Sequence, residues 1–185
     1  MARNKKLVVL CEGAVLVALS YALSFIKIPI GVSFGGFGGS IDLVMIPLLV
    51  FALRRGAWQG LVAGLVFGTL KYFFAGGSAV NWQSMLLDYS LAYMAVGAAG
   101  LLKGEASPLR YALGALVGCV ARFAVHFVSG VTIYAQYMPE TMLGITLPNP
   151  TVYSIIYNGT YMLPNTVLAV ALLAALALPL KKIKL

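Results

Sequence analysis

Charged residues are scarce in this sequence. Only 10% of its 185 residues are Asp, Glu, Lys or Arg, while 61% are hydrophobic. A soluble domain has about 25% charged residues. The mean hydropathy of +0.94 is instead typical of an integral membrane protein. We therefore expect an all-α integral membrane protein with one compact domain, residues 1–185.

Histidine and cysteine are also rare. The chain has one histidine, His126, and two cysteines, Cys11 and Cys119, which lie in apolar runs without a CxxC pair. Such cysteines are more often buried packing residues than members of a disulfide or metal site. One histidine and scattered acids make a poor metal site. We expect no metal and no cofactor.

Catalytic motifs are missing as well. There is no GxxxxGK[ST] phosphate-binding loop, so the chain cannot supply its own ATPase. No acid follows His126 and Ser129 on their predicted helix to complete a catalytic triad. The sequence therefore predicts that this protein is not an enzyme.

The hydrophobic sequence is divided by turn signals into six apolar segments. Glycine-rich, basic and proline-containing stretches separate them. A membrane span needs about 20 residues, so the second segment is short and is expected to be tilted or partly unwound. We predict a bundle of six transmembrane helices at about 6–26, 40–53, 57–75, 83–102, 110–136 and 152–180.

The basic residues indicate the orientation of this bundle. In a six-span arrangement, most of the 13 lysines and arginines fall on one side of the membrane. The positive-inside rule then places both termini in the cytoplasm. The net charge of +8 is explained by this topology, and no nucleic-acid partner is expected. The residues on the cytoplasmic side are Arg3, Lys5, Lys6, Arg54, Arg55, Lys103, Arg110, Lys181, Lys182 and Lys184.

Four polar residues fall in the outer half of different predicted helices. They are Asp42, Asp88, His126 and Asn158. A charge at the centre of a membrane helix costs about 2.5–3.5 kcal/mol, so such residues tend to face a bundle interior or a cavity. A packed, hydrogen-bonded core histidine is an equal alternative for His126 alone. Its row with Gly130 and Tyr134 on one helix face favours ligand contact.

Aromatic residues gather at the same outer ends, whereas the cytoplasmic ends hold few of them. An interfacial aromatic belt would occur on both sides of the membrane. The asymmetry favours an outward-facing pocket, in which rings stack on a flat cationic ligand and carboxylates balance its charge. The outer aromatics are Phe34, Phe37, Tyr72, Phe73, Phe74, Trp82, Tyr134, Tyr137, Tyr153, Tyr157 and Tyr161.

Other features of the helices fit internal packing. Gly60, Gly64 and Gly68 recur every four residues, a spacing that lets helix backbones approach closely. Arg122, one turn from His126, is expected to anchor the bundle through an ion pair, with Glu12 as the candidate partner.

Several motifs in this order resemble the thiamine-binding S components of energy-coupling factor (ECF) transporters. They are "LRRG" after the second segment, "LLDY" at 86–89, "HFVSGV" at 126–131 and "YSIIYNGTYMLPN" at 153–165. The resemblance covers nearly the whole chain. It implies a six-helix protein that is monomeric on its own and captures the vitamin from outside a prokaryotic plasma membrane. It also implies a partner module with one membrane scaffold subunit and two ATPase subunits.

The resemblance also assigns residues. It places the ligand-binding carboxylates at Asp88 and Asp42, and a pyrimidine-contacting histidine at His126. The remaining ligand contacts that it implies are Tyr153, Asn158, Tyr134 and Phe37. Ala14 and Ala18, spaced by one turn on the first helix, match a small-residue surface that the family uses for docking.

This chain departs from the family pattern in two ways. Aspartate stands for glutamate at both acidic positions, and Tyr134 stands for a tryptophan beside the thiazolium ring. We therefore expect an altered affinity. An S component for another flat vitamin or a thiamine precursor remains an alternative, and so does a stand-alone secondary transporter, although the internal repeat expected of many such transporters is not evident.

Overall fold

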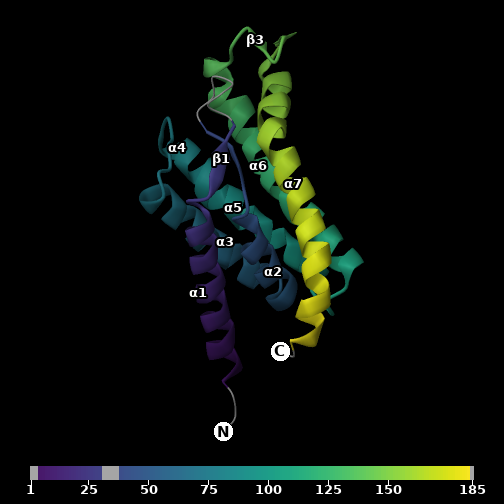
Figure 1. Cartoon of the computed structure of the whole chain (residues 1–185). Coiled ribbons are helices and arrows are strands. Elements are labelled where there is room, and N and C mark those ends of the chain that lie inside the picture. Colours follow the sequence, from purple (N-terminus) through teal and green to yellow (C-terminus); the bar gives the residue numbers. More distant parts are fainter. Residues whose placement is uncertain (1–3, 31–37, 184–185) are drawn as a thin grey trace.

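The protein is a bundle of helices (Figure 1), and its computed structural model describes residues 4–30 and 38–183. The described residues form six helices when the continuous run Trp82–Leu102 is counted as one. The prediction of an all-α bundle with six helices is therefore confirmed. The other five helices are α1 (Lys5–Leu23), α2 (Met45–Arg55), α3 (Ala57–Phe74), α6 (Pro108–Thr132) and α7 (Pro150–Lys182).

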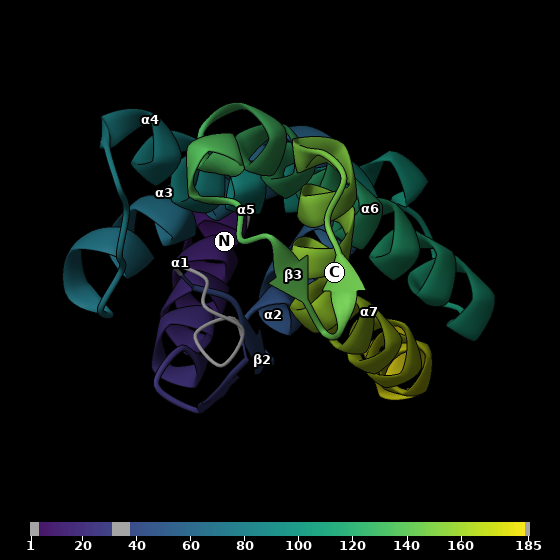
Figure 2. The same ribbon diagram turned by 90° about the horizontal axis from the view of Figure 1, so that it is seen from above.

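Four of these helices are long and apolar enough to cross a membrane: α1, Trp82–Leu102, α6 and α7. The chain is thus a multi-pass membrane protein. Helix α2 has 11 residues, which is too short for a bilayer. Eight of those residues are buried, and α2 lies between α1 and α7 when the bundle is seen from above (Figure 2). It is a core helix, with Leu48, Leu49 and Leu53 almost completely buried.

The beginning of the predicted second segment is extended. Residues Ser40–Asp42 form strand β2, which pairs antiparallel with β1 (Lys27–Pro29), so that Lys27 lies opposite Asp42. Strand pairing gives the backbone groups of these extended residues hydrogen-bond partners. The expectation of a partly unwound segment is confirmed.

The start of α1 and the end of α7 lie at the same end of the bundle, which we name the terminal end (Figure 1). An even number of membrane crossings places both termini at the same end. The ion pair between Lys181 and Glu105, 3.0 Å apart, brings the last helix next to the loop before α6 at this end. Lys181, which the sequence assigned to the cytoplasmic side, thus lies beside the loop that the sequence assigned to the same side. We name the opposite end the cavity end.

The helix Trp82–Leu102 changes its winding along its length. It consists of α4 (Trp82–Met85), a π-helical turn η2 (Leu86–Leu91), α5 (Ala92–Val96) and a 3₁₀ segment η3 (Gly97–Leu102). Helix α3 packs closely against it. A Cβ atom on Gly64 or Gly68 would lie 2.1–2.2 Å from the carbonyl oxygens of Tyr93 and Tyr89. These glycines serve internal packing, as predicted.

Short elements follow α6 at the cavity end (Figure 1). Helix α6 ends at Thr132, earlier than predicted, and continues as the 3₁₀ turn η4 (Tyr134–Tyr137). A small hairpin of β3 (Thr141–Met142) and β4 (Ile145–Thr146) comes next. Asn149 then caps α7 by accepting a hydrogen bond from the Val152 amide, and Pro150 occupies the first turn, a favourable position for proline.

Candidate ligand-binding site

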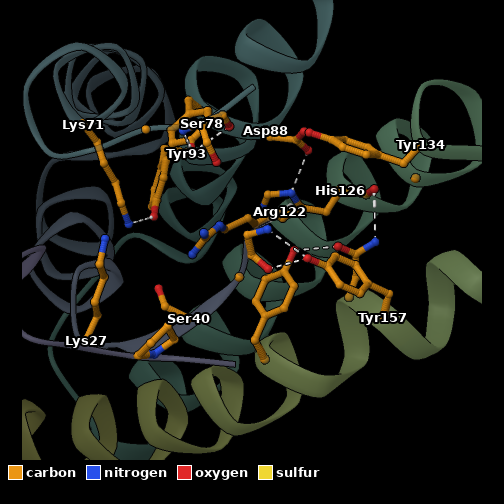
Figure 3. Close-up of a pocket in the computed structure, with 18 of the residues that line it drawn as sticks. Lys27, Ser40, Lys71, Ser78, Asp88, Tyr93, Arg122, His126, Tyr134 and Tyr157 are labelled. Carbon is orange, nitrogen blue, oxygen red and sulfur yellow. Dashed lines mark hydrogen bonds and ion pairs between the residues drawn. The ribbon is translucent and has the colours of Figure 1, made fainter. Parts of the chain in front are cut away.

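A cavity of about 230 Å³ opens at the cavity end of the bundle (Figure 3). Its walls come from β1, the segment 38–40, the end of α3 with the following loop, Trp82–Leu102, α6, the η4 turn and α7. The polar, charged and tyrosine residues that line it are Lys27, Ser40, Lys71, Ser78, Asp88, Tyr89, Tyr93, Arg122, His126, Tyr134, Tyr153, Tyr157, Asn158 and Tyr161.

Asp88 and His126 form the centre of one half of the cavity, which we name the carboxylate half. The His126 Nδ1 atom lies 3.1 Å from Asp88 Oδ1, and the Ser129 hydroxyl donates a hydrogen bond of 3.0 Å to Asp88 Oδ2. Asp88 lies on the π-helical turn, and such turns are frequent at functional sites. Among the described residues, the buried Nε2 atom of His126 has no hydrogen-bond partner.

Asn158 is held by its neighbours on α6 and α7. Its Nδ2 atom donates to the carbonyl oxygens of Ser154 (2.9 Å) and His126 (3.3 Å). Its Oδ1 atom accepts a 2.5 Å hydrogen bond from the Tyr161 hydroxyl. Gly130 lets the two helices approach closely here, since a Cβ atom at this position would lie only 2.2 Å from the Ser154 hydroxyl. The amide group is therefore fixed in one orientation at the wall of the cavity.

Tyrosine rings complete the carboxylate half. Tyr153 and Tyr157 stack with their centroids 5.6 Å apart, and the Tyr157 hydroxyl accepts a 3.1 Å hydrogen bond from the Gly38 amide. Tyr134 points its hydroxyl towards the Asp88 carboxylate (Figure 3). The carboxylate and these rings offer a negative charge and flat apolar faces to a ligand.

The other half of the cavity, which we name the cationic half, contains Lys27, Lys71 and Arg122. The Lys71 ammonium group donates to the Tyr93 hydroxyl (2.6 Å) and lies 3.4 Å from Asp42 Oδ2. The Arg122 guanidinium lies over the Tyr93 ring, 4.1 Å from its centroid. Lys71 and Arg122 are both buried, at 8% and 6% exposure.

The expected ion pair between Arg122 and Glu12 is wrong. Glu12 binds Arg54, with Nε and Oε1 2.7 Å apart, and also binds Arg55. Short helix α2 brings both arginines beside α1 at the terminal end, whereas Arg122 lies in the wall of the cavity. Arg122 therefore does not anchor the bundle through Glu12.

The predicted binding residues are distributed as follows. Five of them line this cavity: Asp88, His126, Tyr134, Tyr153 and Asn158. Asp42 does not line it, since its buried carboxylate faces Lys71, the Ser40 hydroxyl (2.9 Å) and the Val44 amide (3.3 Å). Phe37 lies outside the described residues. Whether these residues bind a ligand stays a prediction.

Lys71, Tyr93 and Lys27 line the cavity without having been predicted as site residues. The sequence carried a signal for Lys71, because a lysine inside an otherwise apolar membrane helix marks a functional position. However, a lysine in the last turn of a membrane helix is equally typical of an interfacial basic residue. Tyr93 gave no signal, because a single tyrosine within a membrane helix is common.

Among the described residues, no group of three or more His, Cys, Asp or Glu could hold a metal ion. The arrangement is suited to non-covalent binding. Asp88 can balance a positive charge, the hydrogen-bonding groups of His126 and Asn158 can orient a heterocycle, and the tyrosines can cover its faces.

Comparisons with known proteins point to one family. A sequence model of the family described as "Thiamine transporter protein" matches residues 10–185. Thiamine transporter ThiT of Lacticaseibacillus paracasei is 32% identical, covering 95% of this chain and 90% of that protein. Thiamine transporter ThiT of Bacillus subtilis is 28% identical, covering 95% and 93%. A solved structure of ThiT from Listeria monocytogenes superimposes with a TM-score of 0.81 at 27% identity, covering 95% of this chain and 96% of that one.

Proposed function

This chain belongs to the thiamine transporter protein family, and from that premise we propose that it binds thiamine and mediates its uptake. The protein is the substrate-binding S component of an ECF importer in the plasma membrane of a prokaryote. The terminal end faces the cytoplasm, and the cavity receives thiamine from outside. A scaffold subunit and two ATPase subunits supply the energy.

The Asp88–His126 pair carries this proposal. A half-buried carboxylate with a tyrosine pointing at it is suited to a ligand that combines a cationic ring with an amino group. The Asp88 carboxylate attracts the thiazolium ring and accepts from the aminopyrimidine. The stacked pair Tyr153 and Tyr157 lies on the α7 side and covers a flat ring. The cost of partly desolvating Asp88 is then offset when the ligand is bound.

Equilibrium binding to the purified protein tests this function. We expect saturable binding of thiamine, measured by titration calorimetry or tryptophan fluorescence. Replacing one partner of a desolvated charge pair costs about 2–5 kcal/mol, so Asp88→Asn should weaken thiamine binding by about tenfold or more. Glu140→Gln is the matched control, because Glu140 is an exposed acid that does not line the cavity. Equal affinities of the two variants would contradict the role of Asp88, and a wild-type protein that does not bind thiamine would overturn the proposed function.

Docking to the scaffold is assigned to Ala14 and Ala18. Both are exposed on α1 and lie one helical turn apart, so they form a flat strip that another helix can approach. The double variant Ala14→Trp, Ala18→Trp holds such a helix away. We expect it to abolish ATP-dependent uptake by the assembled complex, while the isolated protein still binds thiamine.

A matched control is available on the same helix. Val15 and Leu19 are also exposed and one turn apart, but they lie on a neighbouring stripe of α1. Val15→Trp, Leu19→Trp should reduce uptake much less. Equal loss of uptake in both double variants would contradict the docking assignment. Uptake by proteoliposomes that contain this chain alone, driven by an ion gradient, would contradict the ECF mechanism.

A further inference from the structure

An open groove runs between α1 and α3, in the half of the bundle that is nearer to the terminal end. Helix α1 lies at the edge of the bundle against α2 and α3 (Figure 1), and much of its apolar surface is exposed. The groove has a volume of about 510 Å³. The residues that line it are Lys6, Val9, Leu10, Gly13, Ala14, Val17, Phe51, Trp58, Gln59, Val62, Ala63 and Val66.

The lining of this groove is apolar and is buried at its base. Phe51 of α2, Val17 and Ala63 form the base and are almost completely buried. Leu10 and Trp58, on the two rims, are 69% and 72% exposed. The surface is therefore hollowed between two helices and is not a flat helix face. An apolar occupant, such as a hydrocarbon chain, matches this lining.

The length of the groove matches one leaflet of a bilayer. A helix rises about 1.5 Å per residue, so the stretch of α1 from Lys6 to Val17 is about 16 Å long. The hydrocarbon core of a bilayer is about 30 Å thick, which gives about 15 Å for each leaflet. One acyl chain from the leaflet at the terminal end can therefore lie along the whole groove.

The mouth of the groove, where α1 begins, carries a positive charge. Lys6 is the one charged residue among those described that line the groove. Glu12 and Glu105, the described acids at the terminal end, are held in ion pairs with other basic residues. They therefore do not balance the charge of Lys6. Trp58, in the first turn of α3, is of the residue type that is enriched where membrane helices meet lipid headgroups.

We propose that the groove binds an anionic phospholipid in the free protein. The lipid phosphate binds the Lys6 ammonium group, and one acyl chain lies between α1 and α3. Basic residues beside a membrane helix attract anionic headgroups, and the apolar groove then holds the chain in a defined place. Ala14 belongs both to this groove and to the strip assigned to the scaffold, so the lipid and a docked scaffold exclude each other. The inference does not depend on which ligand fills the cavity.

Quenching of tryptophan fluorescence by brominated lipids tests the site. The chain has two tryptophans, Trp58 in the groove and Trp82 at the start of α4, outside it. The full chain carrying Trp82→Phe therefore reports lipid at Trp58 alone. It is reconstituted in phosphatidylcholine vesicles that contain phosphatidylglycerol, with bromine on the acyl chains of either lipid. We expect phosphatidylglycerol to bind beside Trp58 about fivefold more strongly, as one basic residue near an anionic headgroup predicts.

Three further substitutions in this background locate the lipid. Lys6→Gln should remove most of the preference for phosphatidylglycerol. Lys5→Gln is the matched control, because Lys5 is an exposed lysine next in the chain that does not line the groove, and it should keep most of the preference. Val66→Phe narrows the groove without changing the charge and should also weaken the binding of phosphatidylglycerol.

Equal quenching by the two brominated lipids before any of these three substitutions would overturn the proposal and leave the groove to a helix of a partner protein. Equal losses in Lys6→Gln and Lys5→Gln would also overturn it, because the charged surface as a whole would then attract the lipid. An unchanged preference in Val66→Phe would contradict the place given to the acyl chain. Thiamine binding by Lys6→Gln should be unchanged, because the cavity lies at the opposite end of the bundle, so these outcomes are separate from the proposed function.

Discussion

Two groups of buried or half-buried cations lie at opposite ends of this bundle, and their surroundings differ. At the terminal end, Glu12 of α1 bridges Arg54 and Arg55, whose side chains are 10% and 14% exposed. At the cavity end, Lys71 shares Asp42 with backbone and hydroxyl donors, and Arg122 has no carboxylate partner among the described residues. Both groups place arginine in an apolar protein, but only the first supplies a carboxylate for it.

The difference separates two uses of a membrane arginine. Where the fold supplies the counterion, as Glu12 does, the charge ties α1 to the turn between α2 and α3 and serves stability. Where the described residues offer no carboxylate, as for Arg122, the charge has a desolvation cost without an ion pair to offset it. Removal of the first kind of charge partner should therefore destabilise the free protein more than removal of the second kind of charge. The four predictions below test this contrast, beginning with the largest effect.

Glu12→Gln should cause the largest loss of stability. The substitution keeps the shape of the side chain but leaves two half-buried arginines without a carboxylate. Breaking a buried pair in this way costs about 3 kcal/mol in the free energy of unfolding. Unfolding of the purified protein by SDS in detergent micelles measures this loss, and thiamine affinity of the folded fraction should be retained. A loss no larger than that of an exposed ion pair would show that the bridge is not structural.

Asp42→Asn should have the next largest effect. The Asp42 carboxylate is 2% exposed and accepts from Lys71, the Ser40 hydroxyl and the Val44 amide. Hydrogen bonds to a charged group contribute about 1.5–3 kcal/mol, so we expect a loss of about 2 kcal/mol in the same SDS titration. Ser40→Ala removes one of the three donors and is the control, with a smaller loss. If the two variants are equally stable, the Lys71–Asp42 pair contributes nothing.

Arg122→Met should change the stability of the ligand-free protein little. Removing a buried charge that has no partner also removes its desolvation cost, while the methionine keeps most of the apolar contact with Tyr93. We expect the free energy of unfolding to stay within about 1 kcal/mol of the wild type or to rise. Arg54→Met should be less stable than Arg122→Met, because Arg54 gives up an ion pair with Glu12. The reverse order would break the contrast between the two groups.

Glu105→Gln should have the smallest effect. The pair between Glu105 and Lys181 lies at the terminal end like the Glu12 bridge, but its side chains are 72% and 61% exposed. Exposed ion pairs contribute about 0.5 kcal/mol or less. Unfolding in detergent at low and high salt should give nearly the same midpoint for this variant and for the wild type. A loss comparable with that of Glu12→Gln would mean that burial does not decide the strength of these pairs.

Much of the fold could be predicted because a bilayer constrains a sequence strongly. A spanning helix must be long and apolar, so α1, α6 and α7 were recognisable from composition alone. The predicted second segment, 40–53, was less accurate. Residues 40–42 form a strand, and the helix that follows lies in the core without spanning a bilayer. Pairing with β1 decides this, and such a contact between distant residues leaves little trace in local composition.

The candidate site also had features that could be predicted from the sequence and features that could not. Asp88, His126 and Asn158 could be placed at a similar depth because a helix rises a constant distance per residue. Their meeting in one cavity is decided by how the helices pack. The partner of Arg122 could not be inferred, because several helices present acids and depth does not tell which of them are neighbours. The contacts of Lys71 with Tyr93 and Asp42 could not be inferred either, because depth does not report which way a side chain turns.

The sequence by itself determined the membrane setting, the number of helices, the clustering of basic residues at one end and the depth of the polar side chains. These properties depend on position along the chain and along the membrane normal, which hydrophobicity and helical rise report directly. The tertiary structure alone decided which charges meet. Glu12 pairs with Arg54 and Arg55, whereas Arg122 lies in the wall of the cavity. These neighbours depend on how the helices pack side by side, with close approaches such as that of Gly64 to Tyr93.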